Sequence, residues 1–283
     1  MTYKLLDIIN LSREYLEKNG FENGRFEAET LISNYYNMKR LDLYLQFDKP
    51  VTESEKLDLR KLIARRKNHE PIQHIIGSSG FMGYDFKVSK DVLIPRFDTE
   101  TLVEKVSDYI GERELKILDI GTGSGAIIIS ILKLTPNSRG IGIDISEKGL
   151  EIAKINSVNL KVDSRVSFFK KDIFEEFRVK EKFDIVVSNP PYIAKNEMEY
   201  LDREVAFFEP RSALTDDGDG LSFYRRIKDL LPTILKSDGK FILEYGYKQR
   251  EDIEGIFKGY NYEIIKDLSG NDRGIFGGFL GNV

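Results

Sequence analysis

Up to about residue 70, the chain places apolar residues at helical spacing. Residues 5–16 and 26–35 each carry an apolar side chain every three or four positions, which is typical of amphipathic helices. A third helix is expected after Thr52, because Thr52 and Glu55 have the spacing of a capping box. The pattern predicts a small helical domain over residues 1–70.

Residues 71–95 have a different pattern, with closely spaced glycines and an alternation of apolar and polar positions. The glycines are Gly77, Gly80 and Gly83, and the alternating apolar residues are Tyr84, Phe86 and Val88. This combination predicts a β-hairpin. We expect it to connect the helical domain to a second domain over residues 96–283.

From residue 96 onward, buried strands are expected to alternate with helices. The expected strands are 116–120, 140–144, 166–169, the run ending at Ser188, 240–245, 262–265 and 275–280. The expected helices are one capped by Asp98 or Thr99, then 126–134, 146–158, 221–235 and one more before the last strands. This alternation predicts an α/β fold with a mostly parallel, Rossmann-like, seven-stranded sheet that ends in an antiparallel hairpin.

Composition excludes several kinds of site. The 283 residues include no cysteine, so disulfides, thiolate nucleophiles and zinc-cysteine sites are excluded. The two histidines, His69 and His74, do not share a helix face, and we expect a structural or surface role for both and no metal site. A basic run, residues 60–67, is expected to form a solvated helix face.

The charge balance and the hydropathy pattern limit the classes of binding partner that we expect. With 43 basic and 47 acidic residues, the chain lacks the basic excess of a dedicated DNA-binding protein, and no stable nucleic-acid binding is expected. No apolar run is long enough to cross a bilayer, and the N-terminus lacks a signal-peptide pattern. We therefore expect a cytoplasmic protein without membrane contact.

A glycine-rich loop follows the strand 116–120. It reads Gly121-Thr122-Gly123-Ser124-Gly125 and lies between a strand and a helix, where missing side chains allow a ligand to approach the backbone. Asp144 ends the next strand, where a carboxylate can accept hydrogen bonds from both hydroxyls of a ribose. The arrangement predicts a nucleotide cofactor.

Two cofactors fit this loop. Gly121, Gly123 and Ala126 match a dinucleotide fingerprint, which leaves an NAD-dependent dehydrogenase open. Asp119 instead favours S-adenosylmethionine, because a carboxylate beside the glycines attracts the cationic methionine end and repels a pyrophosphate. In that case Asp172 and Ile173, after the third strand, flank the adenine.

A second motif, Asn189-Pro190-Pro191-Tyr192, follows the strand that ends at Ser188. The prolines fix their own φ angles and donate no N–H, so the Asn189 carboxamide and nearby carbonyls form a rigid set of acceptors. Such a set suits a substrate –NH2 group, and Tyr192 adds a flat face for a planar amide or a base. A dehydrogenase leaves this motif unexplained.

These motifs resemble known families. Asp119 to Gly125 with Asp144 resembles the class I S-adenosylmethionine-dependent methyltransferases, and Ser188 to Tyr192 resembles their amino-methylating branch. Nearly the whole chain is similar to the release factor glutamine methyltransferase family. The further motifs that carry this similarity are Pro71 to Gly77, Pro95-Arg96, Asp98-Thr99-Glu100, Glu209-Pro210-Arg211 and Ala213-Leu214. Phe97 departs from the pattern, since the family commonly has proline there.

The resemblance implies an enzyme that methylates the side-chain amide nitrogen (N5) of the glutamine in the Gly-Gly-Gln motif of peptide chain release factors, leaving S-adenosylhomocysteine. Residues Gly121 to Gly125, Asp144 and Ile173 would contact the cofactor. Asn189, Pro190, Pro191 and Tyr192 would hold the glutamine, with Asn189, Pro190 and Tyr192 as the catalytic group and Asn189 also near the methyl group. The helical domain would bind the partner.

Two alternatives stay open from the sequence. The Asn189 to Tyr192 motif could equally hold a flipped base, as in a DNA or RNA adenine N6-methyltransferase. A non-catalytic binding module that uses the N-terminal helices is the other alternative, and the intact glycine loop argues against it.

Overall fold

The structure, a computed structural model, describes residues 3–281, which form two compact units. The first unit is Met1–Gly77 with Asp202–Phe208, and the second is Ser78–Leu201 with Glu209–Val283. The chain therefore divides after Gly77, whereas the sequence predicts boundaries after residues 70 and 95. Those functional domain boundaries stay predictions.

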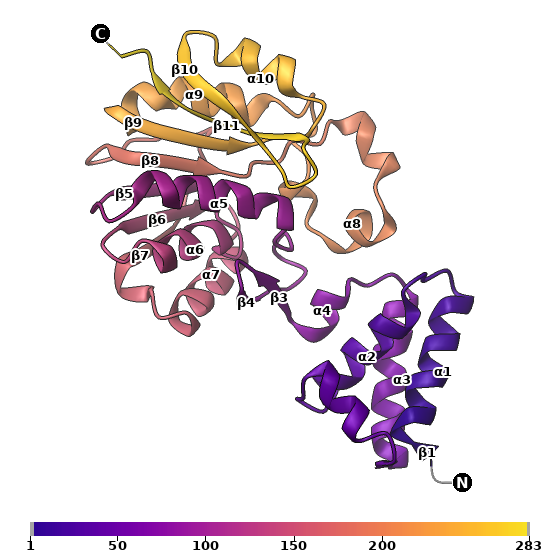
Figure 1. Cartoon of the computed structure of the whole chain (residues 1–283). Coiled ribbons are helices and arrows are strands. Elements are labelled where there is room, and N and C mark those ends of the chain that lie inside the picture. Colours follow the sequence, from indigo (N-terminus) through magenta and orange to yellow (C-terminus); the bar gives the residue numbers. More distant parts are fainter. Residues whose placement is uncertain (1–2, 282–283) are drawn as a thin grey trace. The chain divides into compact units, whose positions relative to one another are not determined.

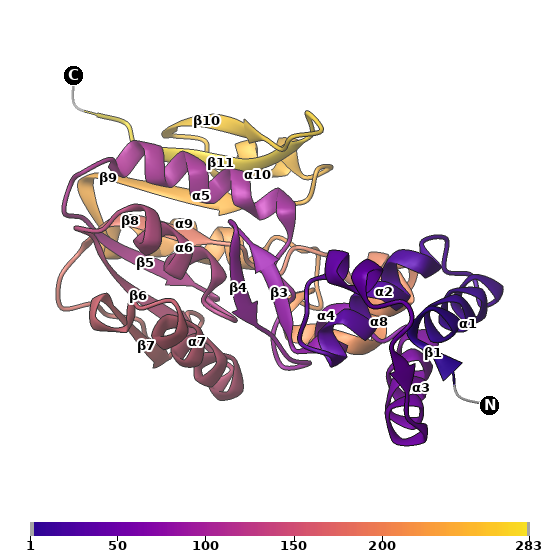
Figure 2. The same ribbon diagram turned by 60° about the horizontal axis from the view of Figure 1, so that its bottom comes forward.

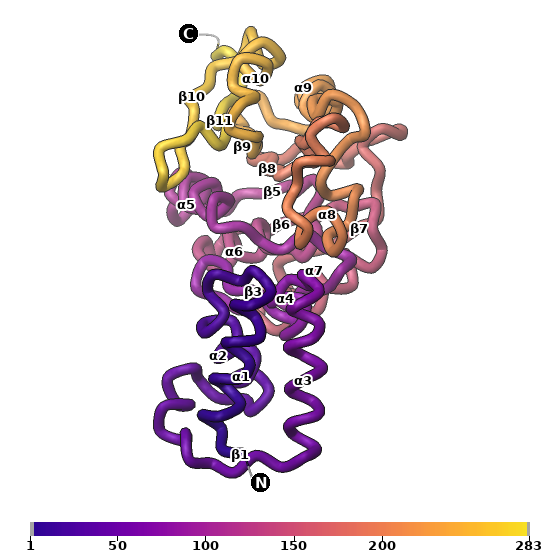
Figure 3. The backbone as a smooth tube through the Cα atoms, turned by 90° about the vertical axis from the view of Figure 1, so that its right-hand side faces the viewer, coloured from indigo at the N-terminus to yellow at the C-terminus, as the bar shows by residue number. Residues whose placement is uncertain are grey.

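The first unit is built on three helices, α1 (Leu5–Lys18), α2 (Gly24–Tyr35) and α3 (Glu53–Lys67). Figure 3 shows them at the indigo end of the chain. The predicted capping box of α3 is confirmed, because Thr52 Oγ1 accepts from the Glu55 amide and the Glu55 carboxylate accepts from the Thr52 amide. The smaller elements are β1 (Tyr3–Lys4), η1 (Arg40–Leu45), β2 (Pro50–Val51), α4 (Ile72–Ile76) and α8 (Arg203–Phe208).

The basic run on α3 is only partly a solvated helix face. Arg66 is 5% exposed, and its guanidinium contacts the carboxylates of Glu27 and Glu204. The prediction of a solvated face is therefore wrong for Arg66, which links α3 to α2 and to α8. A buried guanidinium needs such partners because an unpaired charge away from water is costly.

The second unit confirms the predicted α/β fold with a seven-stranded, mostly parallel sheet. The order across the sheet is β10-β11-β9-β8-β5-β6-β7, and only the pairs made by β11 are antiparallel. The strands are β5 (Lys116–Ile120), β6 (Arg139–Asp144), β7 (Val166–Lys170), β8 (Phe183–Ser188), β9 (Leu235–Glu244), β10 (Tyr260–Lys266) and β11 (Asp272–Phe279).

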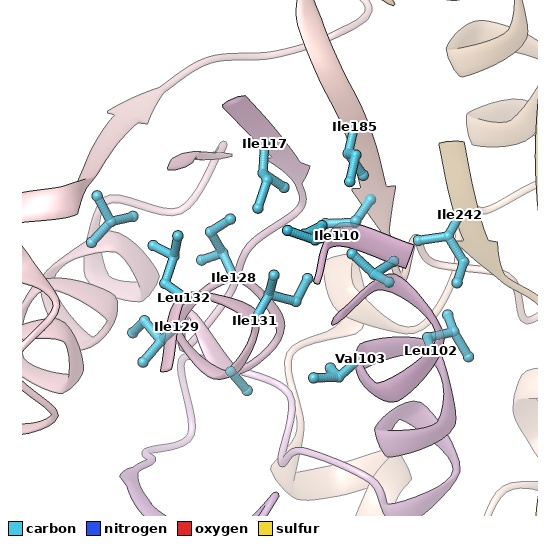
Figure 4. Close-up of a cluster of buried hydrophobic side chains, with 14 of the residues drawn as sticks. Leu102, Val103, Ile110, Ile117, Ile128, Ile129, Ile131, Leu132, Ile185 and Ile242 are labelled. Carbon is cyan, nitrogen blue, oxygen red and sulfur yellow. The ribbon is translucent and has the colours of Figure 1, made fainter. Parts of the chain in front are cut away.

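Helices cover both faces of this sheet (Figure 1). On one face lie α5 (Phe97–Ile110), α6 (Ala126–Leu134) and α7 (Glu147–Asn159). Figure 4 shows the apolar cluster there, in which Leu102 and Val103 of α5 and Ile128 and Ile131 of α6 face strand residues such as Ile185. On the other face, α9 (Ser222–Ile234) and α10 (Arg250–Ile256) cover a second buried cluster.

Two local features differ from the sequence-based expectation, and a third confirms it. Helix α5 begins at Phe97 with Arg96 as its N-cap and no side-chain cap, so the prediction of Asp98 or Thr99 as N-cap is wrong. Short helices α4 and α8 were not predicted. The predicted hairpin is present as β3 (Ser78–Phe81) and β4 (Tyr84–Lys87), drawn side by side in Figure 2.

Candidate active site

One cavity of the second unit is lined by loops that follow three neighbouring strands of the sheet. It is bordered by Gly121 after β5, Asp144 at the end of β6 and Asn189 after β8. The parallel register of the strands explains why these three loops lie close together, because Ile120 pairs with both Ile143 and Ser188. Ligands of open α/β sheets bind at the carboxyl ends of the strands.

The glycine loop leaves open space beside its backbone. Gly121 (φ 71°) and Gly123 (φ 54°) both line the cavity, and a Cβ atom added at either would meet no heavy atom within 4 Å. Positive φ angles favour glycine at both positions. Thr122 and Ser124 of the same loop also line the cavity.

Gly125 has a different environment from the other two loop glycines. It begins α6, and a Cβ there would lie 2.7 Å from Ile129 Cδ1 and 3.2 Å from Ala153 Cβ. It is not among the described residues that line the cavity. Its visible function is to let α6 approach α7, so the predicted cofactor contact of Gly125 stays a prediction.

Asp119 is a fully buried carboxylate behind the glycine loop. The Thr122 hydroxyl donates to its Oδ2 atom at 2.7 Å, whereas Oδ1 has no hydrogen-bond partner among residues 3–281. Burial raises the pKa of Asp119 from 3.8 to about 7, and the negative Asp144 adds to the rise. Such an unsatisfied acceptor suits a cationic ligand group.

Asp144 is held by backbone amides at the cavity edge. Its Oδ2 accepts from the Gly123 amide at 2.8 Å and its Oδ1 from the Ser146 amide at 2.9 Å. Burial raises its pKa, while these bonds act in the opposite direction. Each carboxylate oxygen can still accept a further bond, so Asp144 is able to bind a diol.

Two aromatic side chains, Phe174 and Phe223, line the cavity. Asp172 and Ile173, which the sequence predicts beside the adenine, line it as well. The two phenylalanine rings meet edge to face with centroids 5.0 Å apart. A planar, uncharged ring system can pack against such side chains.

The Asn189 side chain is fixed by contacts from α5 and β9. Its Nδ2 donates to Thr99 Oγ1 at 3.3 Å, and the Thr99 hydroxyl donates to Glu244 Oε2 at 2.5 Å. Asn189 and Pro191 line the cavity, whereas Pro190 and Tyr192 are not among the described lining residues. The structure thus brings part of the predicted acceptor motif to the cavity and leaves the roles of Pro190 and Tyr192 as predictions.

The backbone of Tyr192 is fixed separately. Gln249 Nε2 donates to the Tyr192 carbonyl oxygen at 2.8 Å. Gly220 (φ 78°) packs so closely that a Cβ there would lie 2.2 Å from the same oxygen. Burial raises the pKa of the Tyr192 phenol, which keeps it protonated. The acceptor motif is therefore held at both ends by residues far away in the sequence.

Several residues at the site were not predicted from the residue pattern. Arg96 lines the cavity and contacts the buried Glu209 carboxylate at 2.5 Å, and the Thr99–Glu244 pair supports Asn189. The signal for Glu244 was available, since an acidic residue at the carboxyl end of a buried strand is unusual. Among the described residues, no group of three His, Cys, Asp or Glu side chains could hold a metal ion, and no helix is long and apolar enough to span a membrane.

Comparison with known proteins gives two family models. Residues 7–77 match the model described as PrmC N-terminal domain, and residues 112–271 match the model described as Methyltransferase domain. The first match ends at Gly77, where the first segment of the N-terminal unit also ends.

Two curated relatives match over nearly the whole chain. The release factor glutamine methyltransferase of Fusobacterium nucleatum is 42% identical over 95% of this chain and 77% of its own length. That of Geobacter sulfurreducens is 38% identical over 97% of this chain and 96% of its own. A solved release factor-specific protein-(glutamine-N5) methyltransferase from Alicyclobacillus acidocaldarius is 28% identical, with a TM-score of 0.42, over 68% of this chain and 98% of that one.

Asp119→Asn should stabilise the ligand-free protein above neutral pH. The folded-state pKa of Asp119 is raised, so between about pH 4 and 7 the folded state binds more protons than the unfolded state, and rising pH removes stability. The variant lacks this loss, and its advantage in unfolding free energy should grow to about 1–4 kcal/mol by pH 8. Urea unfolding at pH 5 and pH 8 measures it. Asp85→Asn, at an exposed position, is the control, and an equal effect at both pH values would contradict a buried charge at Asp119.

Proposed function

This chain belongs to the release factor glutamine methyltransferase family, and from that membership we propose its reaction. It transfers a methyl group from S-adenosylmethionine to the side-chain amide nitrogen (N5) of the glutamine in the Gly-Gly-Gln motif of peptide chain release factors. The observation that carries the proposal is the shared cavity of the glycine loop and Asn189. The curated relatives are named for release factor methylation, which does not favour a DNA or RNA adenine methyltransferase.

The residues of the cavity fit S-adenosylmethionine, whose sulfonium supplies an activated methyl group. Gly121 and Gly123 leave open space for it. Asp119 is fully buried and is not among the described lining residues, but its Oδ1 lacks a hydrogen-bond partner and suits an ammonium group, directly or through water. Asp144 suits the ribose hydroxyls. Asp172, Ile173 and Phe174 would flank the adenine. The transfer needs no metal ion, because the methyl donor is already charged.

Asn189 and Pro190 would hold the substrate amide. Because Nδ2 of Asn189 donates to Thr99, its Oδ1 is the atom left to accept from a substrate –NH2 group, and the Pro190 carbonyl is the second acceptor. Tyr192 and Pro191 would form the walls against which the planar amide lies. An amide nitrogen is a poor nucleophile, so orientation has to lower the barrier, and orientation can contribute up to about 7–11 kcal/mol.

The proton balance requires no strong base before attack. As the N–C bond forms, positive charge develops on the nitrogen, and the two acceptors stabilise it. The methylated nitrogen is acidic and then loses its proton to water. The transfer leaves S-adenosylhomocysteine and an N5-methylglutamine.

The partner and the location belong to the same proposal. We infer that the helical domain of residues 1–70 contacts the release factor, and that the protein works in the cytoplasm, where release factors act. The 43 basic residues do not outnumber the 47 acidic ones, which fits a protein substrate better than a nucleic acid.

Incubation with methyl-labelled S-adenosylmethionine should label a release factor and leave DNA unlabelled. Peptide mapping should place the methyl group on the glutamine of the Gly-Gly-Gln motif. A release factor whose motif reads Gly-Gly-Ala is the matched control. Label on DNA, or on the control, would contradict the proposed substrate.

Asn189→Ala should lower kcat by about 10²–10³-fold, because the substrate nitrogen loses an acceptor aimed at its developing charge. Binding of S-adenosylhomocysteine, measured by calorimetry, should change by less than about threefold, since the variant leaves the glycine loop intact. Normal turnover of this variant would refute the role of Asn189.

Asp144→Ala should weaken binding of S-adenosylhomocysteine by about 10–100-fold, because hydrogen bonds to a charged acceptor contribute roughly 1.5–3 kcal/mol. Calorimetry measures the affinity. Asp144→Asn, which keeps one acceptor oxygen, should lie between the wild type and Asp144→Ala. An unchanged affinity in both variants would rule out the ribose contact.

A further inference from the structure

We propose that Thr99 and Glu244 are positioning residues that decide which end of the Asn189 carboxamide faces the cavity. The inference rests on the proposed function, because it assigns the exposed end to the acceptor of the substrate –NH2 group. Neither residue lies in the glycine loop or in the Asn189 to Tyr192 motif.

Three separate elements bring the residues together. Asn189 follows β8 and Glu244 ends the neighbouring parallel strand β9, where Ser188 pairs with Leu243. Thr99 lies in the first turn of α5, which covers that part of the sheet. Thr99 is 4% exposed and Glu244 is 1% exposed, so the hydrogen bond between them is largely shielded from water.

The direction of the hydrogen bonds sets the orientation of the amide. A threonine hydroxyl has a single proton, and Thr99 gives it to Glu244 Oε2 at 2.5 Å. Only lone pairs of Thr99 Oγ1 then remain for Asn189, so the –NH2 end of the carboxamide must face Thr99. The contact from Asn189 Nδ2 to Thr99 Oγ1, 3.3 Å, has this direction. Oδ1 is thereby turned away from Thr99.

The chemistry of the carboxamide makes its orientation decisive. The two ends differ little in shape, but one end donates and the other accepts. With Oδ1 toward the cavity, Asn189 accepts from a substrate –NH2 group. With the carboxamide reversed, two donors would face each other and the substrate nitrogen would lose its acceptor.

When Glu244 is ionised, the hydrogen bond can run only from Thr99 to Glu244, because a carboxylate only accepts hydrogen bonds. Its side chain faces Thr99 and Asn189, and the guanidinium of Arg273 favours its charge while Asp98 opposes it. Tyr224 donates to the Glu244 backbone carbonyl at 2.7 Å, and the Tyr192 phenol is also close enough for Glu244 to raise its pKa.

Protonation of Glu244 would reverse the relay. Burial raises the pKa of Glu244 from 4.5 to about 7. A protonated carboxyl group can donate to Thr99, whose own proton then turns to Asn189 and selects Oδ1. The correct orientation is therefore present above about pH 7 and is lost as the pH falls.

Thr99→Val tests the relay because valine keeps the shape of threonine and removes the hydroxyl. We expect kcat for a release factor to fall about 100-fold, as for other losses of alignment, with KM for S-adenosylmethionine within about threefold. Thr99→Ser should restore most of the activity. The control is Thr101→Val in the same helix, whose hydroxyl bonds only to the helix carbonyl of Asp98.

Glu244→Gln tests the charge with nearly unchanged packing. We expect a fall in kcat similar to that of Thr99→Val, and little further loss in the double variant, because both residues orient the same carboxamide. Glu263→Gln, an exposed acid on β10 paired with Lys105, is the control. Full activity of both Thr99→Val and Glu244→Gln would overturn the proposal.

The orientation can also be observed without a substrate. In ¹⁵N-labelled protein, the Asn189 side-chain NH2 signals, identified by their loss in Asn189→Ala, should shift between pH 8 and pH 6 in the wild type and stay fixed in Glu244→Gln. Signals that are identical in the wild type, Thr99→Val and Glu244→Gln at every pH would refute the relay. If no release factor is methylated by the wild type, the proposed function fails, and these signals still decide the orientation of Asn189.

Discussion

The ladder of backbone hydrogen bonds between β5, β6, β8 and β9 is the constraint on which the site depends. Its parallel register places Ile120, Ile143, Ser188 and Leu243 at one level of the sheet. The glycine loop, Asp144, Asn189 and Glu244 follow these residues directly, so they emerge at one edge although they are far apart in the chain. A shift of one strand by one residue would also exchange the side chains that it directs to the two cores, and the packing of these cores therefore fixes the site.

The same edge carries an unfavourable electrostatic arrangement. Asp119 and Glu244 are buried carboxylates whose pKa values are raised by burial to about 7. A protein selected for stability alone would have little use for them, because a buried charge is costly without a partner. Asp119 has an oxygen, Oδ1, without a hydrogen-bond partner among residues 3–281, and we propose that it serves a cationic group of the cofactor. Glu244 accepts a hydrogen bond from the Thr99 hydroxyl. The apolar clusters on both faces of the sheet offset this cost.

Sequence reasoning succeeded where local pattern and tertiary structure agree. The strand 116–120, the helix 126–134 and the end of the strand at Ser188 have the predicted bounds, because mostly apolar runs end there beside or close to glycine or proline. It failed at the start of α5. Asp98 and Thr99 have the side chains of N-caps, but Asp98 pairs with Arg273 and Thr99 bonds to Glu244. Both partners lie far along the chain, so no local rule could identify them.

The same limit applies to the candidate site. The glycine loop and the Asn189 motif were visible because each is contiguous in sequence. The residues that hold the Asn189 motif were not recognisable in this way. Gln249, Gly220, Thr99 and Glu244 reach the site only through the fold. Arg66 shows a similar effect in the N-terminal unit, where its burial comes from α2 and α8 and not from the charge pattern of α3.

The charge of Glu244 offers a reason why the proposed acceptor at position 189 is an asparagine and not a carboxylate. A carboxylate at position 189 would accept hydrogen bonds equally well, but it would place another negative charge beside the buried Glu244. A carboxamide avoids that charge and introduces a different problem, because its two ends are similar in shape and opposite in hydrogen bonding. Thr99 and Glu244 together solve this problem. The hydroxyl of Thr99 accepts a hydrogen bond from one end of Asn189 while donating one to Glu244, so the proposed acceptor depends on a residue that need not touch the substrate.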